Sequence, residues 1–101
     1  MEILEEVDIE EFTRSGRPVP EAKRYRIRVD KQVVTTENAA PTGREILALV
    51  GKTPQTHILA QKIRGAQPQV VNPDDRVDLR APGVERFVTT PRDSTEGARA
   101  S

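Results

Sequence analysis

The pattern of apolar and polar positions is clearest at residues 24–29, which read RYRIRV. One aromatic and two aliphatic side chains alternate strictly with three arginines. A two-residue period of this kind predicts a half-buried strand with one apolar and one basic, solvated face. Residues 30–31 predict a tight turn, and the β-branched segment QVVTTE at 32–37 predicts the hairpin partner of the first strand.

The pattern then changes to a helical period in the segment NAAPTGREILALVGK. Thr42 is a good N-cap, and Glu45 follows three residues later, as a capping box requires. One helical face carries four apolar residues: Ile46, Leu47, Leu49 and Val50. Gly51 stands at the C′ position, and Pro54 prevents the helix from resuming. A helix this short is not stable alone and must pack on a sheet.

Three further strands are predicted at residues 57–63, 69–71 and 84–90, with Pro91 ending the last one. A hairpin, one helix and a return to the sheet is the order of the β-grasp fold. We therefore predict an α+β domain with one helix on a mixed four- to five-stranded sheet. Its first and last strands are expected to lie centrally and parallel to each other.

The flanks of this pattern differ from the body in composition and charge. Residues 1–22 lack a full helical stripe and contain two prolines, so they are predicted to be an acidic, flexible extension and linker. This segment carries a net charge of −5, whereas the body at 23–90 carries +5. Residues 91–101 are a polar tail. The opposite charges indicate that extension and body could meet, although a solvated acidic tail is the alternative.

Composition restricts the chemistry further. The 101 residues include no cysteine, which excludes disulfides and thiol-based sites and favours a reducing cytoplasm. The longest apolar runs are only a few residues, so neither a membrane span nor a signal peptide is expected.

Other candidate sites are weak. The single histidine, His57, lacks the partners of a catalytic base and is predicted to be a surface strand residue. The cluster of Asp74, Asp75 and Asp78 is better explained by turn formation than by a metal. The basic face of residues 24–29 could contact nucleic acid, but the chain has only three aromatic residues for base stacking. We therefore expect no cofactor, no metal and no nucleic-acid partner.

Three segments carry a family resemblance: YRIRVD, TGREILALVG and NPDDRVDLRAPGVERFVT. They resemble the bacterial ubiquitin-like proteins of the multiubiquitin family, and the likeness covers residues 25–90. The segment HILAQK is also similar to LIFAGK of ubiquitin, which is weaker support. The resemblance implies conjugation chemistry with an activating enzyme, a conjugating enzyme and a metal-dependent deubiquitinase-like peptidase. It also implies bacterial antiviral defence and modification of target proteins.

The resemblance gives the tail a role. Gly97 is followed by four residues, so a peptidase would cut between Gly97 and Ala98 and leave glycine as the mature end. Glycine suits a narrow enzyme channel because it lacks a Cβ. The chain would be the substrate of conjugation and not an enzyme. Against this, the family of ubiquitin itself has a Gly-Gly pair, and one glycine in a polar tail is ordinary. A sulfur carrier ending in a thiocarboxylate is a third hypothesis, which the missing pair disfavours.

The strand at 57–63 predicts a recognition surface. Alternation places Ile58 and Ala60 on the open face of the sheet, where partners could bind. Leu59 and Ile63 are expected to pack under Ile46 and Leu49 of the helix.

The extension predicts a second interaction. Residues 3–12 read ILEEVDIEEF, and around Val7 and Ile9 apolar and acidic residues alternate as in a strand. Such a segment could add to the sheet edge formed by residues 32–37. It could do so within one molecule or between molecules, which would give self-association, or it could remain undocked. If the tail is incidental, the alternative function is a non-covalent interaction module whose acidic arm binds partners.

Overall fold

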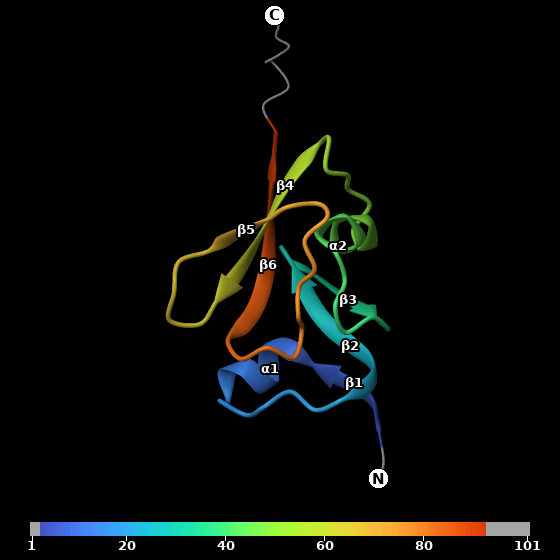
Figure 1. The fold of residues 1–101 in the computed structure, drawn as a ribbon, viewed down its shortest axis with the longest axis vertical. Coiled ribbons are helices and arrows are strands. Elements are labelled where there is room, and N and C mark those ends of the chain that lie inside the picture. Colours follow the sequence, from blue (N-terminus) through green and yellow to red (C-terminus); the bar gives the residue numbers. More distant parts are fainter. Residues whose placement is uncertain (1–2, 93–101) are drawn as a thin grey trace, which may run out of the picture.

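A computed structural model describes residues 3–92 of the chain. Two helices and six strands follow each other along it (Figure 1): β1 (Leu4–Asp8), α1 (Ile9–Arg14), β2 (Ala22–Val29), β3 (Gln32–Thr36), α2 (Gly43–Leu49), β4 (His57–Ile63), β5 (Gln69–Val71) and β6 (Val84–Pro91). Within these residues, neither helix is long and apolar enough to cross a membrane.

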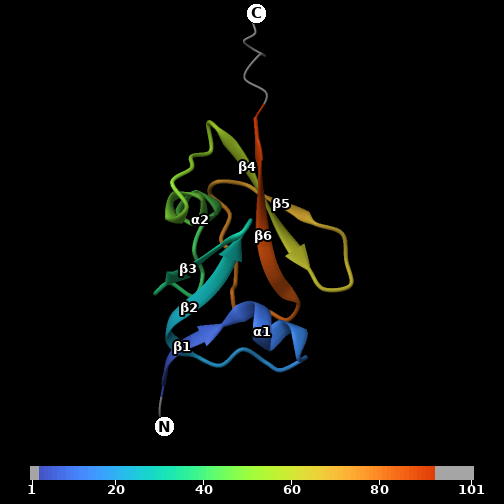
Figure 2. The same cartoon turned by 180° about the vertical axis from the view of Figure 1, so that it is seen from behind.

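The sheet confirms the predicted β-grasp topology. Its strand order is β1-β2-β6-β4-β5, with β3 on the other edge of β2. The central strands β2 and β6 are parallel and meet where Val29 pairs with Phe87. The pairs β2–β3, β4–β5 and β4–β6 are antiparallel. In both views α1 and β1 lie at one end of the sheet, and β6 runs away from them toward the other end (Figures 1 and 2).

Helix α2 is held by the signals that predicted it. The Thr42 side chain accepts a hydrogen bond from the backbone N–H of Glu45, whose carboxylate accepts one from the Thr42 N–H in return. Gly51 ends the helix with φ +73°. Gly43 is required by close packing, because a Cβ there would lie 2.6 Å from the Asn72 carbonyl oxygen.

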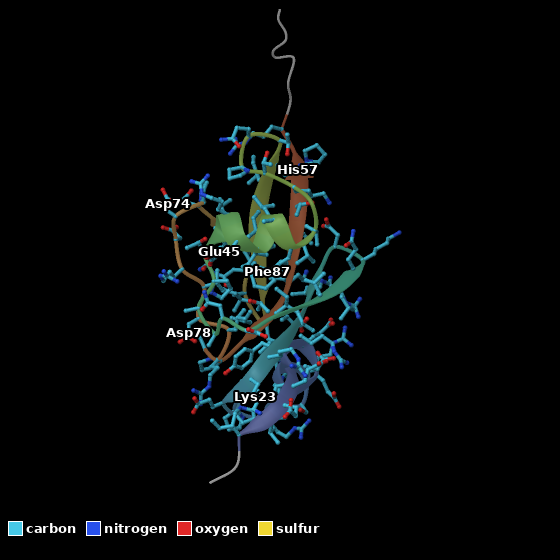
Figure 3. All side chains as sticks on the ribbon, turned by 90° about the vertical axis from the view of Figure 1, so that its right-hand side faces the viewer. Lys23, Glu45, His57, Asp74, Asp78 and Phe87 are labelled. Carbon is cyan, nitrogen blue, oxygen red and sulfur yellow. The ribbon has the colours of Figure 1, made fainter. Side chains whose placement is uncertain are left out.

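The core lies between α2 and the sheet. It is formed by fifteen side chains that are at most 8% exposed, and the central Phe87 is completely buried (Figure 3). Helix α2 contributes Ile46 and Leu47, but Leu49 remains 37% exposed. The expectation that Leu49 packs over β4 is therefore wrong: the short helix turns Leu47 inward in its place.

The largest difference from the sequence expectation is at the N-terminus. Residues 4–14 form β1 and α1 and join the sheet, where a flexible extension was predicted. Strand β1 runs parallel to β2, with Leu4 opposite Ala22 and Asp8 opposite Arg26. The arm, defined here as residues 3–14, therefore adds a sixth strand and a second helix to the β-grasp body.

A carboxylate joins the two central strands at the end opposite the arm. Asp30 adopts φ +56° in the β2–β3 turn, and its side chain accepts hydrogen bonds from the Thr89 N–H at 2.8 Å and from Lys52 Nζ at 3.3 Å. Thr89 Oγ1 donates a further bond at 2.6 Å. Partial burial raises the pKa of Asp30, but the hydrogen bonds from Thr89 and Lys52 outweigh it, so the pKa lies below its ordinary value.

We predict that Asp30→Asn lowers the free energy of unfolding by about 1–2 kcal/mol at neutral pH, because charge-assisted bonds are lost while Asn tolerates the positive φ. A carboxyl with a lowered folded-state pKa stabilises the fold above its unfolded pKa and loses this effect as pH falls through the folded one. Urea unfolding from pH 7 to pH 3 measures both effects. The exposed Asp74→Asn is the control, and equal loss in the two variants would contradict the prediction.

Candidate functional site: an open sheet face and a docked arm

The face of the sheet turned away from α2 carries a strip of apolar side chains. Ala60 on β4 pairs directly with Val70 on β5 and with Val88 on β6, so the three side chains share one face. Ile58 lies two residues along β4 on the same side. Val70 is 64% exposed, and the other three are partly exposed. We call Ile58, Ala60, Val70 and Val88 the open-face strip.

The opposite face of the same strands belongs to the core. Leu59 is 1% exposed and pairs with Val71, which is 5% exposed. The predicted division of β4 between the two faces is therefore what the structure has, with Ile63 only partly buried at the end of the strand.

The open-face strip ends in two positive charges. Lys62 on β4 and Arg86 on β6 pair across the strands, so like charges lie side by side. Within residues 3–92 neither has a carboxylate within 4.0 Å. Because adjacent like charges repel each other, this end of the strip favours a partner that brings acidic groups.

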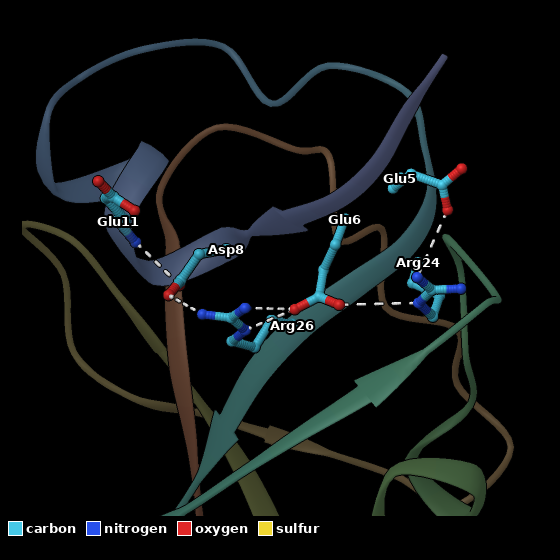
Figure 4. Close-up of polar contacts among 6 residues, drawn as sticks. All are labelled: Glu5, Glu6, Asp8, Glu11, Arg24 and Arg26. Atoms are coloured by element: carbon cyan, nitrogen blue, oxygen red, sulfur yellow. Dashed lines mark hydrogen bonds and ion pairs between the residues drawn. The ribbon is translucent and has the colours of Figure 1, made fainter.

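Acidic side chains of the arm meet the basic face of β2 (Figure 4). Glu6 lies between Arg24 and Arg26, accepting a bond of 2.8 Å from Arg26 Nε and lying 3.7 Å from Arg24 Nε. Asp8 lies 3.7 Å from Arg26 Nη1, and Glu5 lies 3.5 Å from Arg24 Nη2. The basic face predicted as a possible nucleic-acid surface is thus neutralised by the arm.

Two apolar side chains of the arm are buried, whereas Ile3 and Leu4 at its start are 48% and 46% exposed. Val7 and Ile9 are each 1% exposed and join the core. In this arrangement neither of them is accessible to a partner. Strand β1 therefore places Glu6 and Asp8 opposite Arg24 and Arg26, and it places Val7 opposite the buried Tyr25.

Helix α1 continues the docking. Asp8 caps it by accepting a 3.2 Å bond from the Glu11 N–H. The Thr13 hydroxyl donates to the Val84 carbonyl at the start of β6, and Arg64 Nη1 donates to the Thr13 carbonyl at 2.8 Å. An Asp-x-x-Glu capping pattern was the sequence signal for this helix, and the strand-like alternation around Asp8 concealed it.

The predicted receiving edge is corrected by these contacts. The sequence placed the arm on the edge of residues 32–37, which is β3, whereas β1 pairs with β2 on the opposite edge. The physical reason is the charge of β2: its arginines offer partners to the acids of the arm, and β3 has none. Self-association through residues 3–12 stays a prediction.

The arm contacts depend on ionised carboxylates. Hydrogen bonds from Arg26 lower the pKa of Glu6 below its ordinary value of 4.5, against a smaller opposing effect of burial, and the charges of Arg26 and Arg24 lower it further. Ionised Glu6 therefore stabilises the docked arm fully at pH values above its ordinary pKa. This stabilisation is lost as pH falls through the pKa that Glu6 has in the folded state.

The remaining candidate residues are placed as follows. His57 begins β4, and its Nδ1 lies 2.8 Å from the Thr56 hydroxyl. Asp75 and Asp78 accept backbone N–H bonds in turns, as predicted, and Asp74 pairs with Arg44. Within the described part of the chain, no group of three or more acidic or histidine side chains is placed to hold a metal ion.

The exit toward the C-terminus is fixed at the last described residue. The Arg92 N–H donates to the Thr56 carbonyl at 2.9 Å, and its Nε donates to the Pro54 carbonyl at 2.7 Å. The tail residues Gly97 and Ala98 lie outside the described residues. Figure 3 shows His57 at this end of the molecule, far from Lys23 beside the arm.

Comparison with known proteins gives one result. The profile of the Multiubiquitin family matches residues 25–92, which is more than half of the chain. No curated protein and no solved structure matches. The matched region begins inside β2 and ends at Arg92, so the arm lies outside it and the rest of the sheet lies within it.

We predict that Glu6→Gln raises the equilibrium constant for opening of the arm by about two- to fivefold. The effect is modest because Glu6 makes two ion pairs and each exposed ion pair contributes little. Hydrogen exchange of the Val7 and Asp8 amides measures this opening, which should also increase for the unmodified chain as pH falls through the lowered pKa of Glu6. Glu37→Gln, at an exposed position after β3, is the matched control and should leave the exchange unchanged. Equal exchange in the two variants would exclude a role of Glu6 in docking.

Proposed function

The chain belongs to the multiubiquitin family, and on this basis we propose that it is a ubiquitin-like protein modifier in a bacterial ubiquitination-like pathway of antiviral defence. The observation that carries the proposal is the family match over residues 25–92, joined to a β6 strand that is followed in the sequence by a tail with Gly97. The chain would act as the substrate of cytoplasmic enzymes that trim, activate and attach it.

The proposed chemistry proceeds at one carbonyl. A metal-dependent peptidase adds water across the Gly97–Ala98 bond and releases residues 98–101. The new carboxylate attacks the α-phosphate of ATP in the activating enzyme, and pyrophosphate leaves. An enzyme cysteine thiolate then displaces AMP to give a thioester, which passes to the conjugating enzyme. An acceptor nucleophile on the target finally displaces the thiolate.

The geometry of the exit supports this proposal. Arg92 is bonded to the carbonyls of Pro54 and Thr56, so the tail starts at a fixed point. Nine residues follow this point in the sequence, and Gly97 is the fifth of them. A glycine there leaves the carbonyl accessible in a narrow channel, since no Cβ stands beside it.

The open-face strip is the surface we propose for the enzymes. Four apolar side chains on one face of the sheet, with Lys62 and Arg86 at one end, suit a partner with an apolar centre and an acidic rim. The strip lies on strands whose other face is core, so its shape is held rigid.

A second candidate function is a non-covalent interaction module. It is favoured by the arm, which shows that an acidic, aliphatic strand can add to the edge of β2. An arm from a neighbouring molecule would bring the same side chains, so residues 3–12 could support self-association in place of the contact within one molecule.

We predict that Gly97→Val abolishes trimming and conjugation without a change in melting temperature, because a β-branched side chain obstructs both enzyme channels. Intact mass from cells measures loss of residues 98–101, and gel mobility with the cognate enzymes measures adducts. Ala100→Val is the matched control, since it lies in the released segment and should form normal adducts. Normal adducts from Gly97→Val would refute the proposed site.

We predict opposite effects for two isoleucines. Ile9→Ala should lower the free energy of unfolding by about 2–5 kcal/mol, because it leaves a cavity in the core. Ile58→Ala, on the open-face strip, should weaken binding of the activating or conjugating enzyme by about tenfold and change stability little. Calorimetry and affinity measurements give the two values. A large drop in stability for Ile58→Ala would instead assign this residue to the core.

A further inference from the structure

A cavity of about 400 Å³ lies where the arm meets the body. One wall comes from the end of α1 and the linker, with Pro18 and Val19, and the other comes from the loop before β6, with Pro82. The volume lies within the range of ligand pockets, about 300–1,000 Å³. Because both walls are needed, the cavity exists only when the arm is docked.

Three arginines, Arg17, Arg64 and Arg80, line this cavity, and the guanidinium of Arg17 also lies over the Phe12 ring, 4.2 Å from its centre. Each guanidinium group uses only some of its N–H donors in hydrogen bonds within the described residues. Arg80 Nε donates to the Val19 carbonyl at 3.1 Å, and Arg17 Nε donates to the Ser15 hydroxyl at 2.8 Å. Since a guanidinium has five N–H donors, each group retains donors for a further acceptor.

None of the three is neutralised. Among residues 3–92, no carboxylate lies within 4.0 Å of any of these guanidinium groups, although every arginine of β2 is paired with an acid of the arm. Two of the three also fasten the arm and its linker to the body, because Arg64 donates to the carbonyls of Thr13 and Arg14 and Arg80 donates to the carbonyl of Val19. These contacts are hydrogen bonds to neutral backbone carbonyls, so holding the arm does not by itself require three unneutralised positive charges around an apolar cavity.

We propose that this cavity binds an acidic peptide segment of a partner protein, with an apolar side chain between the prolines and a carboxylate on the arginines. Arginine holds carboxylates through paired N–H donors, which gives both charge and geometry. A peptide is favoured because arginines of this body already pair with the carboxylates of an acidic, aliphatic segment, its own arm. The site is separate from the open-face strip and goes beyond the proposed conjugation.

The experiment uses the full chain and two blocked tetrapeptides, Glu-Leu-Leu-Glu and Gln-Leu-Leu-Gln. Titration is followed by the amide NMR signals of Gly16 and Gly83, which belong to the two walls. We expect the acidic peptide to shift both signals with a Kd of about 1 mM or tighter. The neutral peptide should bind about tenfold more weakly or not at all, because it cannot pair with the guanidinium groups.

Two variants assign the binding to the cavity. The double variant R17Q/R80Q should raise the Kd of the acidic peptide by about tenfold or more. Pro82→Glu places a carboxylate at the rim without removing any bond that fastens the arm, and it should weaken binding similarly. Arg76→Gln is the control, because Arg76 also donates to a backbone carbonyl, that of Ala40, but lies outside the cavity.

Four results would overturn the proposal: no shift of Gly16 and Gly83, equal binding of the two peptides, shifts confined to the open-face strip, or equal weakening by Arg76→Gln. Unchanged Val7 and Tyr25 signals in the free variants show that the arm remains docked. No conjugating enzyme enters this assay, so its result is independent of the proposed modification at Gly97.

Discussion

Strand β2 is the element on which the rest of the structure depends, because three other strands pair with it. Its strict alternation allows this. The apolar side forms the centre of the core, where Ile27 is 2% and Val29 0% exposed. The basic side holds the acids of the arm through charge. One strand therefore joins the body, the arm and β6, and a shift of register by one residue would turn arginines into the core and undo all three contacts.

The body could be predicted from sequence because its signals are local. Thr42 and Glu45 form a capping box across four residues, Gly51 needs only its own backbone conformation, and Asp30 sits in a turn between two strands. Such features do not depend on distant parts of the chain. The side of β4 that faces the core also followed from alternation, and Leu59 lies there as expected. The exposure of Leu49 could not be predicted in this way, because the elements that pack against a short helix decide which of its sides is buried.

The arm could not be placed from sequence because pairing is a choice between edges. Val7 and Ile9 alternate with acids, and that pattern suits either edge of the hairpin. Only the fold shows that β3 closes one edge of β2 and leaves the other free for part of its length. The cavity was equally hidden. Arg17, Arg64 and Arg80 are far apart in the chain, and each reads alone as an ordinary surface charge.

The two ends of the sheet are chemically distinct, and this separation constrains how the molecule can work. At one end the arm packs on the starts of β2 and β6 through ion pairs and two buried aliphatic side chains. At the other end, Asp30 bonds Thr89 and Arg92 bonds Pro54, and neither contact includes an arm residue. Opening of the arm therefore removes no bond that fixes the exit of the tail. The fold therefore keeps the contacts of the arm, at one end of the sheet, separate from the contacts that hold the end of β6 at the other.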